Sequence, residues 1–154
     1  MKKIAVAFIL MAIGMISCHP HEKHSDGEEH SGSAENIRNG VFIHLSKGAE
    51  DAHRVLMAFK MAEVMSIDKD VIMYLDIEAV HLVVNGAPDV SKKGFPSSLE
   101  QIKKLTDAGV IIQACPTCLK VAGYSEEDLM TGVILANKEK FFNFTQGKIL
   151  TIDY

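Results

Sequence analysis

The stretch VIIQACPTCLKVAG, residues Val110–Gly123, decides the fold that we expect for this chain. Residues 110–112 are β-branched and apolar, which is typical of a strand that is buried on both faces of a sheet. Pro116 favours the first position of a helix, because that position needs no N–H donor and proline already has the required φ. The stretch therefore predicts a strand that passes directly into a short helix, with Cys115 at the junction.

Cys115 is the candidate reactive residue, because a thiol beside a helix start meets free N–H groups and the positive end of the helix dipole. In such settings cysteine pKa values fall from about 8.5 to roughly 3.5–7.5, and the thiolate is the form that attacks, carries sulfur or binds metal. Cys118, three residues on, is the predicted partner. We therefore expect Cys115 and Cys118 to be the catalytic pair. The alternative is that both are small apolar side chains with a packing role.

The first 17 residues are typical of a signal peptide. Lys2 and Lys3 precede the apolar run Ile4–Ile16, which is too short to span a bilayer comfortably. The run continues into Met-Ile-Ser-Cys (15–18), which is similar to the end of a bacterial lipoprotein signal. We expect Cys18 to be lipidated, with an ordinary cleaved signal or an uncleaved anchor as alternatives. The predicted location is the cell envelope, on the periplasmic side, with the membrane reached through the lipid anchor.

Residues 18–39 predict a flexible, His-rich tether between the lipidated cysteine and the folded domain. The segment is polar and contains glycine and serine without apolar periodicity. A mobile acidic tract with imidazoles could hold Zn²⁺ or Cu²⁺ weakly, or it could serve only as a spacer. Its histidines are His19, His21, His24 and His30.

The remaining residues, 40–154, alternate between strand and helix patterns. We expect strands over 41–45, 71–75, 110–112, 132–136 and 149–152, and helices over 50–66, 97–108, 116–122 and 138–145. Residues 77–84 suit a short helix or an extended piece. Three phenylalanines of the last helical segment are expected in the core: Phe141, Phe142 and Phe144. Strands that alternate with helices predict a three-layer α/β/α fold around a mostly parallel sheet of about five strands.

The composition limits the partners. A net charge of −4 and only two arginines, Arg38 and Arg54, exclude nucleic acid and an anionic membrane surface as electrostatic partners. With 47% hydrophobic residues the chain can build a real core. We expect no bound cofactor.

Three stretches make the chain resemble the DsrE/DsrF-like family of small sulfur-relay proteins. They are HLSKGAEDAHRVLMAFKMAEVM (His44–Met65), VIMYLDIEAVHLV (Val71–Val83) and ACPTCLKVAGYSEEDLMTGV (Ala114–Val133). The last is the most specific, because a cysteine directly follows the middle strand. The resemblance covers roughly Asn39–Tyr154.

The resemblance implies a three-layer α/β/α domain that assembles as a homo-oligomer, and we expect a trimer or a multiple of it. The apolar methionine and phenylalanine content supports that expectation. It also implies a cysteine that carries sulfur as a persulfide, a role that maps onto Cys115. Cys118 is less firmly implied, because the family pattern is looser there. Well-studied members act in the cytoplasm, so a lipoprotein signal departs from the family pattern.

Other side chains could complete the site. His44 and Asp76 follow the first two predicted strands, where they could approach Cys115, and His81 lies just beyond. Tyr124 could cover the thiol. Each of the four has a structural role as its alternative.

These observations leave three functional hypotheses. In the first, the protein is a sulfur carrier, a sulfurtransferase-like enzyme or a thiol redox protein. Cys115 then attacks a sulfane or disulfide sulfur and Cys118 resolves the product, and the partner is a sulfur donor, a sulfur acceptor or a thiol redox protein. In the second, a zinc or copper module uses Cys115, Cys118 and histidines such as His44 and His81. In the third, an oligomeric scaffold holds a static disulfide.

Overall fold

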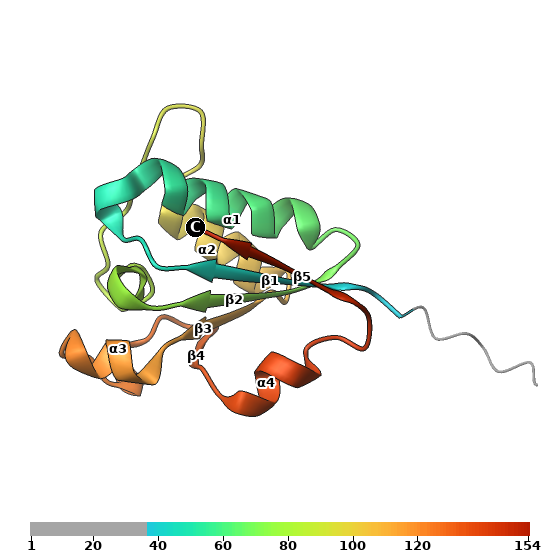
Figure 1. The fold of residues 1–154 in the computed structure, drawn as a ribbon. Helices are drawn as coiled ribbons and strands as arrows, with labels where there is room; N and C mark the ends of the chain where they lie inside the picture. Colours follow the sequence, from blue (N-terminus) through green and yellow to red (C-terminus); the bar gives the residue numbers. More distant parts are fainter. Residues whose placement is uncertain (1–36) are drawn as a thin grey trace, which may run out of the picture. The chain divides into compact units, whose positions relative to one another are not determined.

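A computed structural model describes residues 37–154 and shows a five-stranded sheet in the order β4-β3-β2-β1-β5, with every neighbouring pair parallel (Figure 1). The strands are β1 (Gly40–Leu45), β2 (Asp70–Leu75), β3 (Ile111–Ala114), β4 (Val133–Leu135) and β5 (Ile149–Asp153). The α-helices are α1 (Ala52–Met65), α2 (Ser98–Asp107), α3 (Pro116–Val121) and α4 (Lys138–Asn143). Short 3₁₀ helices are η1 (Ala49–Asp51), η2 (Ile77–Leu82) and η3 (Glu126–Asp128).

Helices cover both faces of the sheet, which confirms the α/β fold and sharpens "mostly parallel" to all-parallel. Helices α1 and α2 lie on one face, and α3 and α4 lie on the other (Figure 1). On the first face, alternate residues of β1 pack against α1 in the core. Ile43 and Leu45 are fully buried there, as are Leu56 and Phe59 of α1.

Local sequence signals explain the helix starts. The side chains of Asp51, Ser97 and Asn137 accept hydrogen bonds from the backbone at the starts of α1, α2 and α4. Each satisfies an N–H that the first helical turn leaves without a partner. Gly109 ends α2 with a φ of 80°, a conformation that glycine adopts without steric cost.

The structure corrects three details of the element predictions. The first helix begins as the 3₁₀ turn η1, and the ambiguous segment 77–84 forms the 3₁₀ helix η2. The expectation that three phenylalanines near α4 enter the core is wrong for Phe142, which is 72% exposed, whereas Phe141 and Phe144 are partly buried and Phe141 packs against Phe42 and Tyr74. Because α4 has only six residues, it offers too few turns to bury an apolar stripe.

No helix of residues 37–154 has the length and apolar character that a membrane crossing needs. The predicted signal peptide, the lipidated Cys18 and tether residues 18–36 lie outside the described residues.

Candidate functional site

Cys115 lies where the sequence placed it, between β3 and α3. Its backbone N–H donates to the carbonyl of Leu75 in β2 (2.8 Å), which continues the parallel ladder to the end of the sheet. Its sulfur accepts a hydrogen bond from the N–H of Cys118 (3.4 Å), so the Cys115 side chain is itself the cap of α3. Both thiols are free, and the Cys115 side chain is buried.

The surroundings of Cys115 favour its thiolate. Burial by itself raises the pKa of this thiol. The Tyr74 hydroxyl and the N–H groups of Cys118 and Thr117 act in the opposite direction, because they donate hydrogen bonds to the charged sulfur. Together they outweigh burial, and the pKa of Cys115 lies below its ordinary value.

Cys118 has the opposite character. The backbone N–H of Ile77 lowers the pKa of this thiol, but burial and the nearby Cys115 sulfur and Asp76 carboxylate raise it more. The pKa of Cys118 therefore lies above its ordinary value, because nearby negative charge disfavours the thiolate. The pair therefore consists of a buried, acidic thiol and a half-buried, less acidic one, the order that the helix-start argument gives.

Tyr74 is one of two residues of the site that the sequence analysis missed. In the parallel register Tyr74 stands opposite His44 on one side and Gln113 on the other, and His44 stands opposite Asp153. These four side chains thus form a row across one face of the sheet, just before the strands end. The Tyr74 ring packs against Phe141 of α4 with ring centroids 5.2 Å apart, and burial raises the pKa of its hydroxyl.

His44 is held between two carboxylates rather than against a thiol. Its Nδ1 is 2.9 Å from Oδ1 of Asp153. Its Nε2 is 3.0 Å from Oδ1 of Asp76, a charge contact whose angle falls short of a hydrogen bond. Burial by itself lowers the pKa of His44, but the two carboxylates raise it above the ordinary value. His44 and Asp76 are thus brought together, and Asp76 is the one that influences the cysteines.

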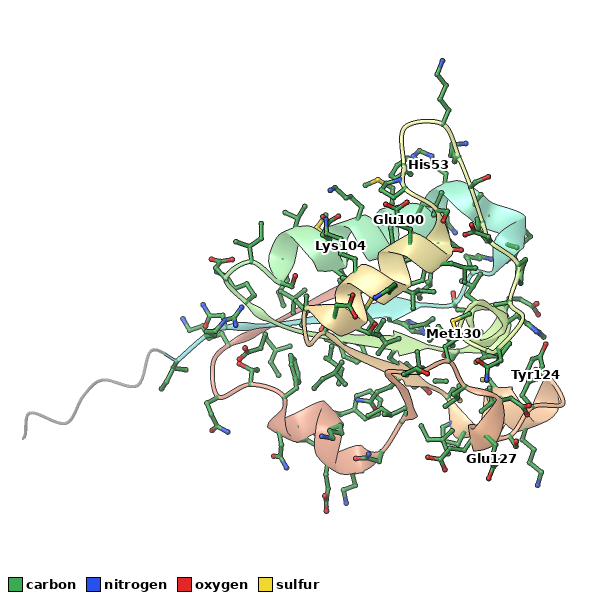
Figure 2. The ribbon with its side chains drawn as sticks, turned by 180° about the vertical axis from the view of Figure 1, so that it is seen from behind. His53, Glu100, Lys104, Tyr124, Glu127 and Met130 are labelled. Carbon is green, nitrogen blue, oxygen red and sulfur yellow. The ribbon has the colours of Figure 1, made fainter. Side chains whose placement is uncertain are left out.

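His81 and Tyr124 contact each other and not the Cys115 sulfur. The Nδ1 atom of His81 is 3.3 Å from the Tyr124 hydroxyl, and the two rings meet edge to face. Tyr124, labelled in Figure 2, lies just beyond α3, so it supports the histidine instead of covering the thiol.

A pocket of about 360 Å³ opens beside Cys118, between η2 and α3. Besides Cys118, it is lined by Ile77, Glu78, His81, Thr117, Val121 and Ala122. Cys118 is therefore the thiol of the pair that borders a cavity, while Cys115 lies behind it.

Metal binding finds no support in the geometry of the part of the chain that the structure describes. No group of three or more His, Cys, Asp or Glu side chains within residues 37–154 is arranged to hold a metal ion. Both ring nitrogens of His44 lie beside carboxylates and not beside the thiols, and Nδ1 of His81 contacts the Tyr124 hydroxyl, so the geometry of residues 37–154 does not bring the sulfur and imidazole set of the second hypothesis together.

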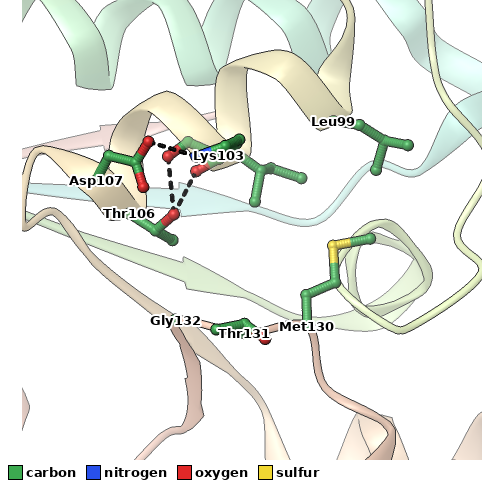
Figure 3. Close-up of a pocket in the computed structure, with 8 residues that line it drawn as sticks. Leu99, Lys103, Thr106, Asp107, Met130, Thr131 and Gly132 are labelled. Carbon is green, nitrogen blue, oxygen red and sulfur yellow. Dashed lines mark hydrogen bonds and ion pairs between the residues drawn. The ribbon is translucent and has the colours of Figure 1, made fainter.

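A second pocket, of about 500 Å³, lies between α2 and the segment before β4 (Figure 3). Three of its polar side chains already have partners: Lys103 pairs with Asp107 (2.7 Å), and the Thr106 hydroxyl donates to backbone carbonyls of its own helix. It is lined by no cysteine, and Met130 and Leu99 supply much of its apolar wall. We therefore place the chemistry at the smaller pocket, next to the thiols.

Two features of the site had different signals in the sequence. Tyr74 could have been found, because it is the single polar side chain near the end of the strand pattern Val71–Leu75 and precedes Asp76 by two residues. Ile77 could not have been found. Its φ of 48° is a left-handed conformation that a β-branched residue rarely adopts, and no local pattern announces it.

Comparisons with known proteins agree with the fold. The sequence model of the DsrE/DsrF-like family matches residues 39–147. Among solved structures, the YchN protein of E. coli is similar with a TM-score of 0.55 and 21% identity, over 74% of this chain and 99% of that one. The MTH1491 protein of Methanobacterium thermoautotrophicum, described as of unknown function, gives a TM-score of 0.53 and 17% identity, over the same shares. At these identities the two structures show the fold alone. No curated protein matches the sequence.

Proposed function

The chain belongs to the DsrE/DsrF-like family and is, at the level of that family, a protein of the sulfur-relay type; from this premise we propose that Cys115 is the sulfur-carrying residue and Cys118 its resolving partner. The observation that carries the proposal is the setting of the Cys115 sulfur. It is buried at the start of α3 and accepts a hydrogen bond from the Cys118 N–H at 3.4 Å, and the neighbouring Tyr74 hydroxyl lowers the pKa of the thiol further. These donors favour the thiolate, which is the nucleophile in sulfur and disulfide chemistry.

The proposed reaction begins when the Cys115 thiolate attacks the outer sulfur of a persulfide or polysulfide donor. A sulfur–sulfur bond forms to Cys115, the donor's own sulfur–sulfur bond breaks, and the shortened donor leaves with the electron pair as a thiolate or shorter polysulfide. Cys115 then holds one extra sulfur as a persulfide. An acceptor thiolate can take that outer sulfur, which returns Cys115 as a thiolate.

Cys118 offers a second outcome. If its thiolate attacks the inner sulfur of the Cys115 persulfide, a Cys115–Cys118 disulfide forms and hydrosulfide leaves. A dithiol reductant must then supply two electrons to restore the pair. The short contact between the Cys118 backbone and the Cys115 sulfur supports this step, because it keeps the two residues within one helical turn of each other.

Mass spectrometry after polysulfide treatment tests the proposal. We expect the wild-type protein and Cys118→Ser to gain the mass of sulfur on the peptide that contains Cys115, and we expect Cys118→Ser to keep the adduct longer. Cys115→Ser should gain none at Cys118 above the level of the urea-unfolded chain. A wild-type protein without an adduct, or an adduct that survives in Cys115→Ser, contradicts the assignment.

We also propose that the protein is anchored on the periplasmic side of the cell envelope through lipidated Cys18. The apolar run and the Met-Ile-Ser-Cys sequence at residues 15–18 support this location. Its sulfur donor or reductant then comes from the envelope and not from the cytosolic thiol pool. Palmitate should label the wild-type protein and fail to label Cys18→Ser. Absence of label from the wild type, with a mature terminus other than Cys18, contradicts it.

A further inference from the structure

The pocket beside Cys118 has a chemical character that the sulfur chemistry alone does not require. Two strongly exposed apolar side chains stand at its edge: Ile77 of η2 is 59% exposed and Val121 of α3 is 83% exposed. Apolar side chains that flank a cavity at a reactive residue are typical of sites that bind the apolar part of a small ligand. At about 360 Å³, the cavity falls in the size range of small-molecule sites.

The conformation of Ile77 is a second, independent observation. A β-branched residue with a φ of 48° is strained, and glycine or asparagine would occupy the same position at lower free energy. Strained residues of this kind cluster at functional sites, where the surrounding structure holds them in place. The backbone of Ile77 lowers the pKa of the Cys118 thiol, and the isoleucine side chain lines the pocket beside that thiol.

The charges around the pocket are acidic. Of its lining residues, all within residues 37–154, none is lysine or arginine, and Glu78 stands on the wall with 61% of its side chain exposed. The Nε2 atom of His81 is 4.0 Å from the Glu78 carboxylate, and Asp76 lies near the Cys118 thiol. An anion that enters this pocket meets negative charge and no fixed cation.

We propose that this pocket binds a small, apolar, non-anionic sulfur compound and presents its sulfur to the cysteine pair. Ile77 and Val121 hold the apolar group, and Glu78 together with Asp76 disfavours anionic donors such as thiosulfate or carboxylated persulfides. The proposal rests on the proposed function, because it names the class of compound that exchanges sulfur with Cys115 and Cys118.

Exchange with simple disulfides tests the selectivity without any need for a stored persulfide. One cysteine thiolate forms a bond to a probe sulfur, the probe's sulfur–sulfur bond breaks, and an alkanethiolate leaves. The second cysteine attacks the resulting mixed disulfide, so the products are the Cys115–Cys118 disulfide and two alkanethiols. The probes are neutral diethyl disulfide, neutral bis(2-hydroxyethyl) disulfide and anionic dithiodiglycolate. Each rate is divided by the rate of the same probe with the urea-unfolded chain.

After this correction, we expect diethyl disulfide to react fastest and dithiodiglycolate to react slower than the neutral hydroxyethyl probe by about threefold or more at low salt. Added salt should narrow the difference, because Glu78 is exposed and its charge is screened. Glu78→Gln should raise the dithiodiglycolate rate and leave the neutral probes unchanged.

Ile77→Asn tests the apolar edge, because asparagine tolerates the left-handed conformation and the fold should remain. Ile77→Asn and Val121→Ser should each slow diethyl disulfide several-fold relative to the hydroxyethyl probe. Ile67→Ser is the matched control: Ile67 is 82% exposed but does not line this pocket, so its rates should equal those of the wild type.

Equal corrected rates for all three probes overturn the proposal, and so does an effect of Ile67→Ser as large as that of Ile77→Asn. The failure of the sulfur-carrier function gives a different result. In that case even prolonged treatment with excess polysulfide, which the acidic pocket slows but does not exclude, leaves no adduct on Cys115, while the order of the disulfide probes can still be measured on the same protein.

Discussion

Among single side chains, Tyr74 does most to favour the thiolate of Cys115. Its ring packs against Phe42 and Phe141, with ring centroids 6.4 Å and 5.2 Å away. The rings of Phe42 and Phe141 also contact each other, with centroids 5.8 Å apart. A hydroxyl that is held by ring packing needs little reorganisation when the sulfur becomes charged. Tyr74 thus acts as a positioning residue that works through Cys115.

Tyr74→Phe should raise the pKa of Cys115, because the substitution removes a donor to the thiolate and keeps the aromatic packing. The expected result is several-fold slower alkylation of Cys115 at mildly acidic pH, with a similar maximal rate at high pH. The measurement is the alkylation rate against pH, read by peptide mass.

Tyr124→Phe is the matched control for that substitution. The Tyr124 hydroxyl contacts His81 and not the Cys115 sulfur, so its loss should leave the Cys115 profile in place. An unchanged profile in Tyr74→Phe, or equal shifts in both variants, contradicts the role of Tyr74.

The sequence predicts the reactive cysteine better than the residues that surround it. Cys115 could be placed because proline, cysteine spacing and an apolar strand are local signals that do not depend on the rest of the fold. Tyr74 and Ile77 act across the sheet and across a loop, so their roles depend on register and on a strained backbone. The position of His44 between two carboxylates also needs β5, whose last residues lie far from β1 in the sequence.

Among the secondary-structure elements, the ends of β1, β2 and β5 are joined by the contacts of His44 with Asp76 and Asp153. The pKa of folded His44 is raised above that of the unfolded chain. The contribution to stability is therefore fully present below the unfolded pKa, about 6.5, and is lost as pH rises through the higher folded pKa.

His44→Gln should consequently lower the free energy of unfolding most at acidic pH. We expect a loss of up to about 1 kcal/mol below pH of about 6.5, which shrinks as the pH becomes alkaline, because Asp153 is exposed and partly screened. Urea unfolding of both proteins across pH measures the difference. A difference that stays constant with pH contradicts the charge-pair explanation.

Secondary-structure elements differ in how well the sequence predicts them. The long α1 and α2 and the buried strands have clear periodicity, and the structure confirms them with shifts of a residue or two at their ends. Helix α4 was predicted as a core helix because of its phenylalanines. Phe141 and Phe142 are adjacent in this six-residue helix, so their side chains point about 100° apart; Phe141 packs against Tyr74 and Phe142 remains exposed.

For the molecule as a whole, exposed apolar side chains point to self-association. Phe142 of α4 and Ile149 and Leu150 of β5 are 72%, 50% and 54% exposed. Strand β5 is also an edge of the sheet, and an uncovered apolar edge strand invites another chain. This surface supports the proposal that the protein forms a homo-oligomer, a trimer or a multiple of it.

Light scattering at micromolar concentration should give the mass of that oligomer. Leu150→Lys should lower the mass, because it places a charge on the exposed edge strand. Ile67→Lys, the same change at an exposed isoleucine between α1 and β2, should leave it unchanged. A monomeric wild type contradicts the proposal, as does equal dissociation by the two variants.

The acidity order of the two thiols tests the central claim most directly. Limited alkylation of the folded wild-type protein over a range of pH, with the labelled cysteine assigned from fragment-ion masses and the urea-unfolded chain as reference, gives the labelling curve of each cysteine. We predict that Cys115 is labelled at a lower pH than Cys118 and below the ordinary cysteine range, since Tyr74 and the α3 N–H groups stabilise its thiolate. Labelling of Cys118 first, or of both thiols together at the pH of the unfolded chain, would contradict the account.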